Sequence, residues 1–131
     1  MSQNAYKAYQ RNSVLTATPG ELTLMLYNGC VKFIRQGRLA LNAGDMERKN
    51  EYLLKAERIV QELIATLDRK QAVTENMLSL YEYMYRQLIA ANMKNDVAAL
   101  DDVEKLAVTF RETWKQVIEK TQADKPKRER V

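Results

Sequence analysis

Thr18-Pro19-Gly20-Glu21 begins the stretch of sequence that decides the fold. A threonine followed three residues later by a glutamate is typical of a capping box, in which each side chain accepts a hydrogen bond from the other residue's backbone N–H. Proline is favoured at the first helical position. The apolar residues that follow recur at helical spacing, so we expect a helix over residues 19–42. Ala43-Gly44-Asp45 then supplies a glycine that ends this helix and an aspartate that caps the next one.

Three more helical patterns follow, over about residues 46–68, 72–94 and 97–120. Arg69-Lys70-Gln71 links the second helix to the third, and Asn95-Asp96 forms the turn before the fourth. Short connections make consecutive helices antiparallel. We therefore expect one all-α domain over residues 18–120, an antiparallel up-down four-helix bundle. A short aromatic cap segment (1–17) precedes it, and a disordered basic tail (121–131) follows.

The composition supports this fold class and narrows the location. The chain has 131 residues but only 4 Gly and 2 Pro, too little turn chemistry for many short strands. No apolar run approaches the roughly 20 residues of a membrane helix, and the polar amino terminus lacks a signal-peptide core. We expect a cytoplasmic protein without membrane insertion. Of the net charge of +4, residues 124–131 contribute four positive and two negative charges, which leaves +2 for the rest.

Histidine is absent and there is a single cysteine, Cys30. Catalytic sites that need histidine, such as Ser-His-Asp triads and HExxH zinc sites, are therefore excluded, as are disulfides within the chain and cysteine-rich zinc sites. The adjacent acids Asp101 and Asp102 stand at a helix start and do not form a catalytic pair. We expect no enzyme activity, no cofactor and no metal ion.

The apolar residues of the first helix cover about 260° of a helical wheel, whereas the second and fourth helices have arcs of roughly 140°. One interpretation is that the first helix is the most central. The other is that its surplus face, with Leu24, Tyr27 and Val31, lines a groove for an amphipathic segment of a partner. Tyr83 falls outside the apolar arc of the third helix and is a fourth candidate for this surface.

Tyr6 and Tyr9 lie in an aromatic segment that is too short to form a stable element by itself. They could cover an apolar groove and yield to a partner. A permanently docked or frayed terminus is the alternative.

Several motifs, in their order and spacing, resemble the FliS family of bacterial flagellin export chaperones. The resemblance covers nearly the whole chain except the basic tail, although Ala5 stands where the family often has proline. It is carried by these motifs: Tyr6-Lys7-Ala8-Tyr9, Thr16-Ala17-Thr18-Pro19-Gly20-Glu21-Leu22, Met25-Leu26-Tyr27-Asn28-Gly29, Leu80-Tyr81-Glu82-Tyr83-Met84, Leu88-Ile89-Ala90-Ala91-Asn92, Asn95-Asp96 and Trp114-Lys115-Gln116.

The resemblance implies a cytosolic helical protein that binds the carboxy-terminal segment of flagellin in apolar grooves. Such a protein prevents premature filament assembly and supports delivery to the cytoplasmic domain of the flagellar type III export gate. It also implies that Tyr6 and Tyr9 cover a groove and take part in docking at the gate. Whether other flagellar regulators bind stays open.

Two rival hypotheses remain. One is a self-associating helical bundle whose extra apolar faces bury each other. The other is a weak nucleic-acid adaptor that uses Lys32, Arg35, Arg38 and the basic tail, although we expect no nucleic-acid partner because no aromatic residues interleave with the charges of the tail.

Overall fold

Helix boundaries in the computed structural model, which describes residues 17–124, follow local capping chemistry. The helices are α2 (Pro19–Asn42), α3 (Met46–Ala65), α4 (Thr74–Lys94) and α5 (Val97–Asp124). The capping box at the start of α2 is confirmed, because the Glu21 N–H donates to Thr18 Oγ1 and the Thr18 N–H donates to Glu21 Oε1, each at 3.1 Å. Asp45 caps α3 by accepting a 3.1 Å hydrogen bond from the Arg48 N–H.

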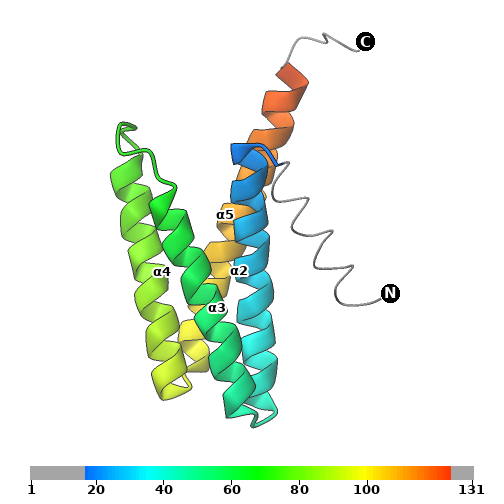
Figure 1. Cartoon of the computed structure of the whole chain (residues 1–131), viewed down its shortest axis with the longest axis vertical. Coiled ribbons are helices and arrows are strands. Elements are labelled where there is room, and N and C mark those ends of the chain that lie inside the picture. Colours follow the sequence, from blue (N-terminus) through cyan, green and yellow to red (C-terminus); the bar gives the residue numbers. More distant parts are fainter. Residues whose placement is uncertain (1–16, 125–131) are drawn as a thin grey trace.

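Consecutive helices run in opposite directions, and each one packs mainly against two others (Figure 1). The neighbouring pairs are α2–α3, α3–α4, α4–α5 and α2–α5, so the four helices close a ring and α2 lies diagonally across from α4. This arrangement confirms the predicted all-α antiparallel up-down bundle for the part of the chain that is described.

Three helix ends differ from the prediction. Helix α3 ends at Ala65 rather than residue 68, because the Thr66 hydroxyl bonds the Leu63 carbonyl and the chain turns there. Helix α4 begins at Thr74 rather than residue 72, where the Thr74 hydroxyl donates to the Asp68 carbonyl and holds the loop. Helix α5 continues to Asp124, so residues 121–124 belong to the helix and not to the predicted tail.

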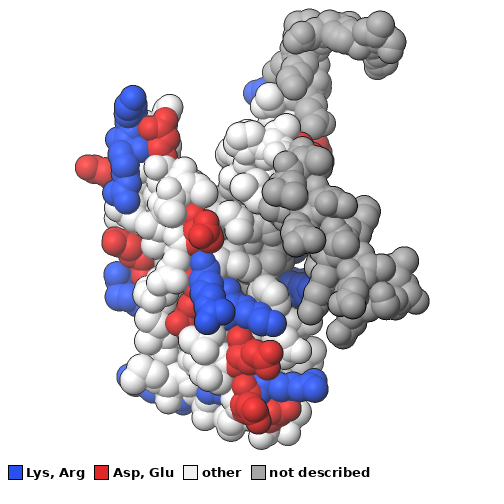
Figure 2. Space-filling model, viewed as in Figure 1, with Lys and Arg blue, Asp and Glu red and all other residues white. Residues whose placement is uncertain are grey.

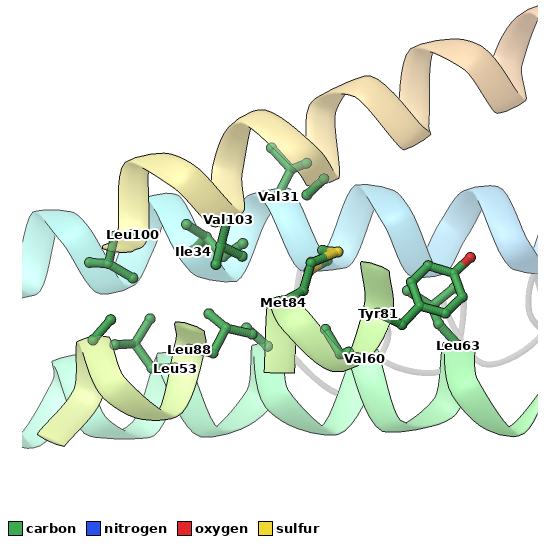
Figure 3. Packing of buried hydrophobic residues seen from close by; sticks show 14 of the residues in the cluster. Val31, Ile34, Leu53, Val60, Leu63, Tyr81, Met84, Leu88, Leu100 and Val103 are labelled. Atoms are coloured by element: carbon green, nitrogen blue, oxygen red, sulfur yellow. The ribbon is translucent and has the colours of Figure 1, made fainter. Parts of the chain in front are cut away.

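All four helices contribute to one apolar core (Figure 3). Of the four glycines, Gly37 has the tightest surroundings, because a Cβ built on it would lie only 2.6 Å from Leu53 Cδ2 of α3. A larger residue at this position would displace the buried Leu53 side chain. The residues of the core cluster are Tyr27, Cys30, Val31, Ile34, Leu53, Ala56, Val60, Leu63, Tyr81, Met84, Leu88, Ala91, Ala99, Leu100, Val103 and Ala107.

The carboxy-terminal half of α5 diverges from α3 and α4 (Figures 1 and 3). Phe110 still contacts Tyr81 of α4, with ring centroids 5.3 Å apart. Further along α5, the Trp114 indole N–H donates to the Gly20 carbonyl of α2 at 2.8 Å. The bundle is therefore fully closed at the end with the α2–α3 turn and more open at the other end.

Candidate functional site

Two of the residues predicted to line a groove, Tyr27 and Val31, lie in the core and are each only 1% exposed. The prediction that they form a surface face is wrong for the described structure. Helix α2 has α3 on one side and α5 on the other, so a wide apolar arc is covered by two neighbours. A helical wheel gives the angular width of the apolar face of one helix, but it does not show which other helices cover that face.

The Tyr27 hydroxyl forms a hydrogen bond with the Tyr81 hydroxyl across the core, with the oxygens 2.5 Å apart. The Phe110 ring stacks on Tyr27 at 5.5 Å and 11°. Burial raises the pKa of both phenols, because an ionised oxygen would lose its hydration there. We name Tyr27, Tyr81 and Phe110 the tyrosine cluster. It joins α2, α4 and α5.

Leu24 and Tyr83, the other two predicted groove residues, are both accessible, but they lie on diagonal helices. Leu24 is half-buried on α2. Tyr83 is 36% exposed on α4, where its hydroxyl donates to the Asp102 carboxylate of α5, and this hydrogen bond raises the pKa of Tyr83. The two residues therefore do not form one site. Tyr6 and Tyr9 lie outside the described residues.

Apolar side chains are exposed on α4 where α5 diverges from it (Figure 1), and we call this place the notch. Tyr83 and Gln87 both donate hydrogen bonds to Asp102 of α5. Leu80 is on the same side of α4, one turn earlier, where α5 has moved away, and it is 41% exposed. The notch comprises the exposed Leu80 and the partly buried Met77, Leu106 and Phe110, which pack against the core.

A second hollow, of about 310 Å³, lies where α5 passes the first turn of α2. Its residues are Thr18, Gly20, Glu21, Trp114, Val117, Ile118 and Thr121. Val117 is 42% exposed there. None of the residues of the notch or of this hollow was among the predicted site residues. The sequence feature that could have indicated this hollow is the apolar pattern of the fourth helix, which continues to Ile118.

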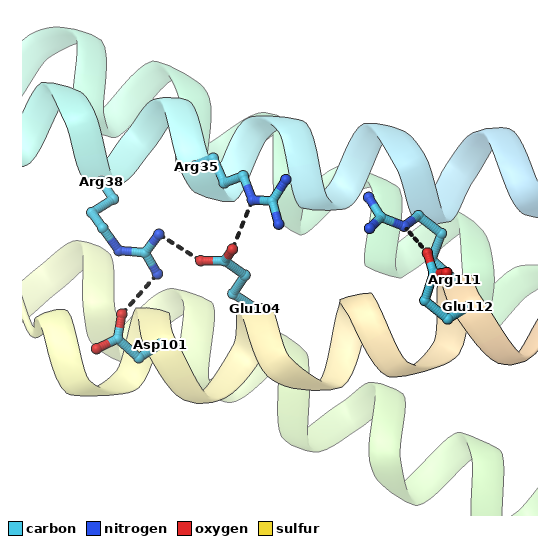
Figure 4. Close-up of polar contacts among 6 residues, drawn as sticks. All are labelled: Arg35, Arg38, Asp101, Glu104, Arg111 and Glu112. Atoms are coloured by element: carbon cyan, nitrogen blue, oxygen red, sulfur yellow. Dashed lines mark hydrogen bonds and ion pairs between the residues drawn. The ribbon is translucent and has the colours of Figure 1, made fainter.

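Four charged side chains fasten α5 to α2 on the outside of the bundle (Figure 4). Glu104 binds Arg35 Nε at 2.7 Å and Arg38 Nη1 at 2.5 Å, and Asp101 binds Arg38 Nη2 at 2.8 Å. Burial alone would raise the pKa of Glu104, but the hydrogen bonds from the two arginines outweigh it and lower that pKa. Two of the three basic residues named for a nucleic-acid site are thus paired within the bundle.

Few side chains among the described residues could act as a catalytic nucleophile or hold a metal ion. Cys30 is fully buried, and burial raises the pKa of its thiol to about 12, which suppresses the nucleophilic thiolate. Between residues 17 and 124, no group of three or more histidine, cysteine, aspartate or glutamate side chains could hold a metal ion. No helix in this range is long and apolar enough to cross a membrane.

The described residues define an all-α helical bundle with apolar side chains exposed on its surface. Residues 2–121 match the family described as "Flagellar protein FliS". The chain belongs to this FliS family.

Relatives in several bacteria share most of the chain. The flagellar secretion chaperone FliS of Bacillus subtilis (strain 168) is 55% identical over 123 residues, which cover 94% of this chain and 92% of the relative. The protein of the same name from Salmonella typhimurium is 37% identical over 118 residues, covering 85% and 87%. A solved structure described as a flagellar chaperone from bacteria superposes with a TM-score of 0.73. It is 22% identical and covers 89% of this chain and 97% of its own, so this likeness concerns the fold.

Proposed function

We propose that the protein is a cytoplasmic flagellar export chaperone that binds the carboxy-terminal segment of flagellin. Binding prevents premature polymerisation and supports delivery to the cytoplasmic domain of the export gate. The observation that carries this proposal is the apolar notch between α4 and α5, in a chain of the FliS family. No chemical step is involved.

The notch suits a client that folds as it binds. Leu80 is exposed because α5 diverges from α4, and an amphipathic helix laid between them would cover it. A segment that orders on binding loses conformational entropy, which keeps affinity moderate and allows release during export. Tyr6 and Tyr9 remain the proposed contacts for covering the groove and for docking at the gate.

Calorimetric titration of the full chain with the carboxy-terminal segment of its own organism's flagellin tests this proposal. We expect a discrete complex and a negative heat-capacity change, because apolar surface is buried. The mass of the free protein is measured over a range of concentrations in the same buffer. Absence of binding to a soluble segment, together with a mass that rises with concentration, would favour the self-associating bundle instead.

Leu80→Asp locates the binding surface. Covering the exposed part of a leucine contributes about 1 kcal/mol, and burying a carboxylate instead adds a further desolvation cost. We therefore expect affinity for the flagellin segment to fall by at least about tenfold. Ser79→Asp, at the neighbouring exposed position of α4, is the matched control. Equal affinities of the two variants would exclude the notch as the binding surface.

A further inference from the structure

The outer seam between α2 and α3 carries a cluster of lysines and aromatic rings that the proposed function does not use. The Phe33 ring of α2 stacks with the Tyr52 ring of α3 at 6.4 Å and 20°. Lys32 Nζ and Lys55 Nζ both lie 5.4 Å from the centroid of the Phe33 ring. Lys55 Nζ is also 5.9 Å from the Tyr52 centroid. We name these four residues the lysine–aromatic face.

The two ammonium groups on this face have little negative charge to balance them. Lys55 has one ion pair, a 3.9 Å contact with Glu51 along the same helix. Lys32 has no ion pair within residues 17–124. In contrast, Arg35 on the same helix is paired with Glu104 at 2.7 Å. Figure 2 shows basic side chains gathered over the middle of α2 and α3. A carboxylate placed between the two lysines would complete the charge pairing.

A hollow of about 340 Å³ lies next to the lysine–aromatic face, towards the α2–α3 turn. Its residues are Gln36, Leu39, Ala40, Ala43, Asp45, Arg48 and Tyr52. Leu39 is 70% exposed at its rim, which is unusual for a leucine in a helix of this bundle. The buried Gln36 Oε1 has no hydrogen-bond partner in the described structure. The hollow thus offers apolar contact, chiefly through Leu39 and Tyr52.

The distance between the lysines and the hollow defines the shape of an occupant. Phe33 and Leu39 are six residues apart on α2, which corresponds to about 9 Å along the helix axis. Residues seven apart on a second helix lie on the same face and are separated by about 10.5 Å. A helix lying along the seam could therefore present a carboxylate to the lysines and an apolar side chain to the hollow.

We propose that the lysine–aromatic face and the adjacent hollow dock an acidic amphipathic helix of a partner protein. This helix carries an aspartate or glutamate seven residues from a leucine or similar apolar side chain. The carboxylate pairs with Lys32 and Lys55, and the apolar side chain contacts Leu39 and Tyr52. This surface lies on the α2–α3 seam and is distinct from the notch between α4 and α5, so it goes beyond binding of the flagellin segment.

The probe is a capped helical peptide of about 18 residues, long enough to populate a helix, with one Glu and one Leu seven positions apart on an Ala/Gln background. Backbone amide shifts of the full-length, isotope-labelled protein map where it binds. We expect shifts around Lys32, Phe33, Leu39 and Lys55, and weaker binding as ionic strength rises. A peptide with Gln in place of Glu should bind at least about tenfold more weakly, since a charge-assisted pair is lost.

A double variant, Lys32→Glu with Lys55→Glu, tests the two lysines. The control is a second double variant, Lys115→Glu with Lys120→Glu, which makes the same change in charge at exposed positions of α5. We expect the first double variant to lose peptide binding and the control to keep it. Circular dichroism verifies that both remain folded. Both should still bind the flagellin segment, so failure of this proposal is distinguishable from failure of the proposed function.

Three outcomes would overturn the proposal. They are no shifts at millimolar peptide, shifts confined to the notch, and equal binding of the Glu and Gln peptides. The proposal would also be overturned if a short single-stranded RNA bound these residues and the acidic peptide did not. The lysines would then bind the phosphate groups of a nucleic acid.

Discussion

The hydroxyl pair of Tyr27 and Tyr81 provides a strict test of the packing, because both oxygens are buried and each is the other's hydrogen-bond partner at 2.5 Å. Tyr27→Phe removes one oxygen and leaves the Tyr81 hydroxyl without a partner in the core. Tyr81→Phe does the reverse. The double replacement removes both oxygens and leaves no unpaired polar group in the tyrosine cluster.

The expected magnitudes follow from this pairing. Leaving one buried hydroxyl unsatisfied costs about 1–3 kcal/mol, whereas replacing both partners by apolar groups of the same shape is nearly neutral. Each single variant should therefore lower the free energy of unfolding by about 1–2 kcal/mol. The double variant should lose less than the sum, with a coupling energy of at least about 1 kcal/mol. For a chain of this size, 1 kcal/mol corresponds to roughly 4 °C in Tm.

Urea unfolding of the wild type and the three variants, followed by circular dichroism, measures the cycle. Tyr85→Phe is the control, since the Tyr85 hydroxyl accepts only an exposed 3.1 Å hydrogen bond from Gln61. Its effect should stay within about 0.5 kcal/mol. Additive losses from Tyr27→Phe and Tyr81→Phe would refute the paired-hydroxyl reasoning. A folded Tyr27→Glu variant with unchanged cooperativity would contradict the core position of Tyr27 itself.

Three further predictions concern α2 and its neighbours. Gly37→Ala should lower the free energy of unfolding, measured in urea, by about 1–2 kcal/mol, because the new Cβ would collide with the buried Leu53 side chain. Gly29→Ala is the comparison. Its Cβ would meet only the end of a half-buried isoleucine at 3.0 Å, so it should change that free energy by less than about 0.5 kcal/mol. The pKa of Glu104 is lower in the folded state than its ordinary value of 4.5. The ionised carboxylate therefore stabilises the folded protein above pH 4.5, and this stabilisation disappears as the pH falls through the folded-state pKa. Glu104→Gln should therefore cost about 1 kcal/mol at pH 7 and progressively less below pH 4.5, and equal losses at pH 7 and pH 3 in urea unfolding would contradict this sign. Cys30, buried and with its pKa raised to about 12, should react with a thiol reagent at pH 8 only after urea unfolds the bundle, and rapid reaction of the folded protein would show that the core opens.

Much of the fold follows from local sequence. The capping box at Thr18 and Glu21 and the aspartate cap at Asp45 predict helix starts because their hydrogen bonds join residues only three positions apart. Helix ends are less predictable. Leu67 continues the apolar spacing of α3 and remains packed on the core, yet it lies in the loop, since a side chain can contact the core from a turn as well as from a helix.

The candidate site was predicted less well, and the reason is geometric. A helical wheel gives the angular width of an apolar face, but Tyr27 and Val31 are covered by helices that are remote in sequence. Leu80 belongs to an ordinary apolar pattern and is exposed only because α5 diverges from α4 beside it. The pattern of a single helix contains no information about that divergence.

The sequence by itself determined the helices, their antiparallel order and the absence of histidine chemistry, because capping, periodicity and composition are local properties of the chain. It also carried the family motifs. Only the tertiary structure decided which apolar faces are core and which are surface. Exposure depends on the relative positions of helices such as α4 and α5, and these positions result from packing among residues far apart in sequence, such as Tyr27, Tyr81 and Phe110.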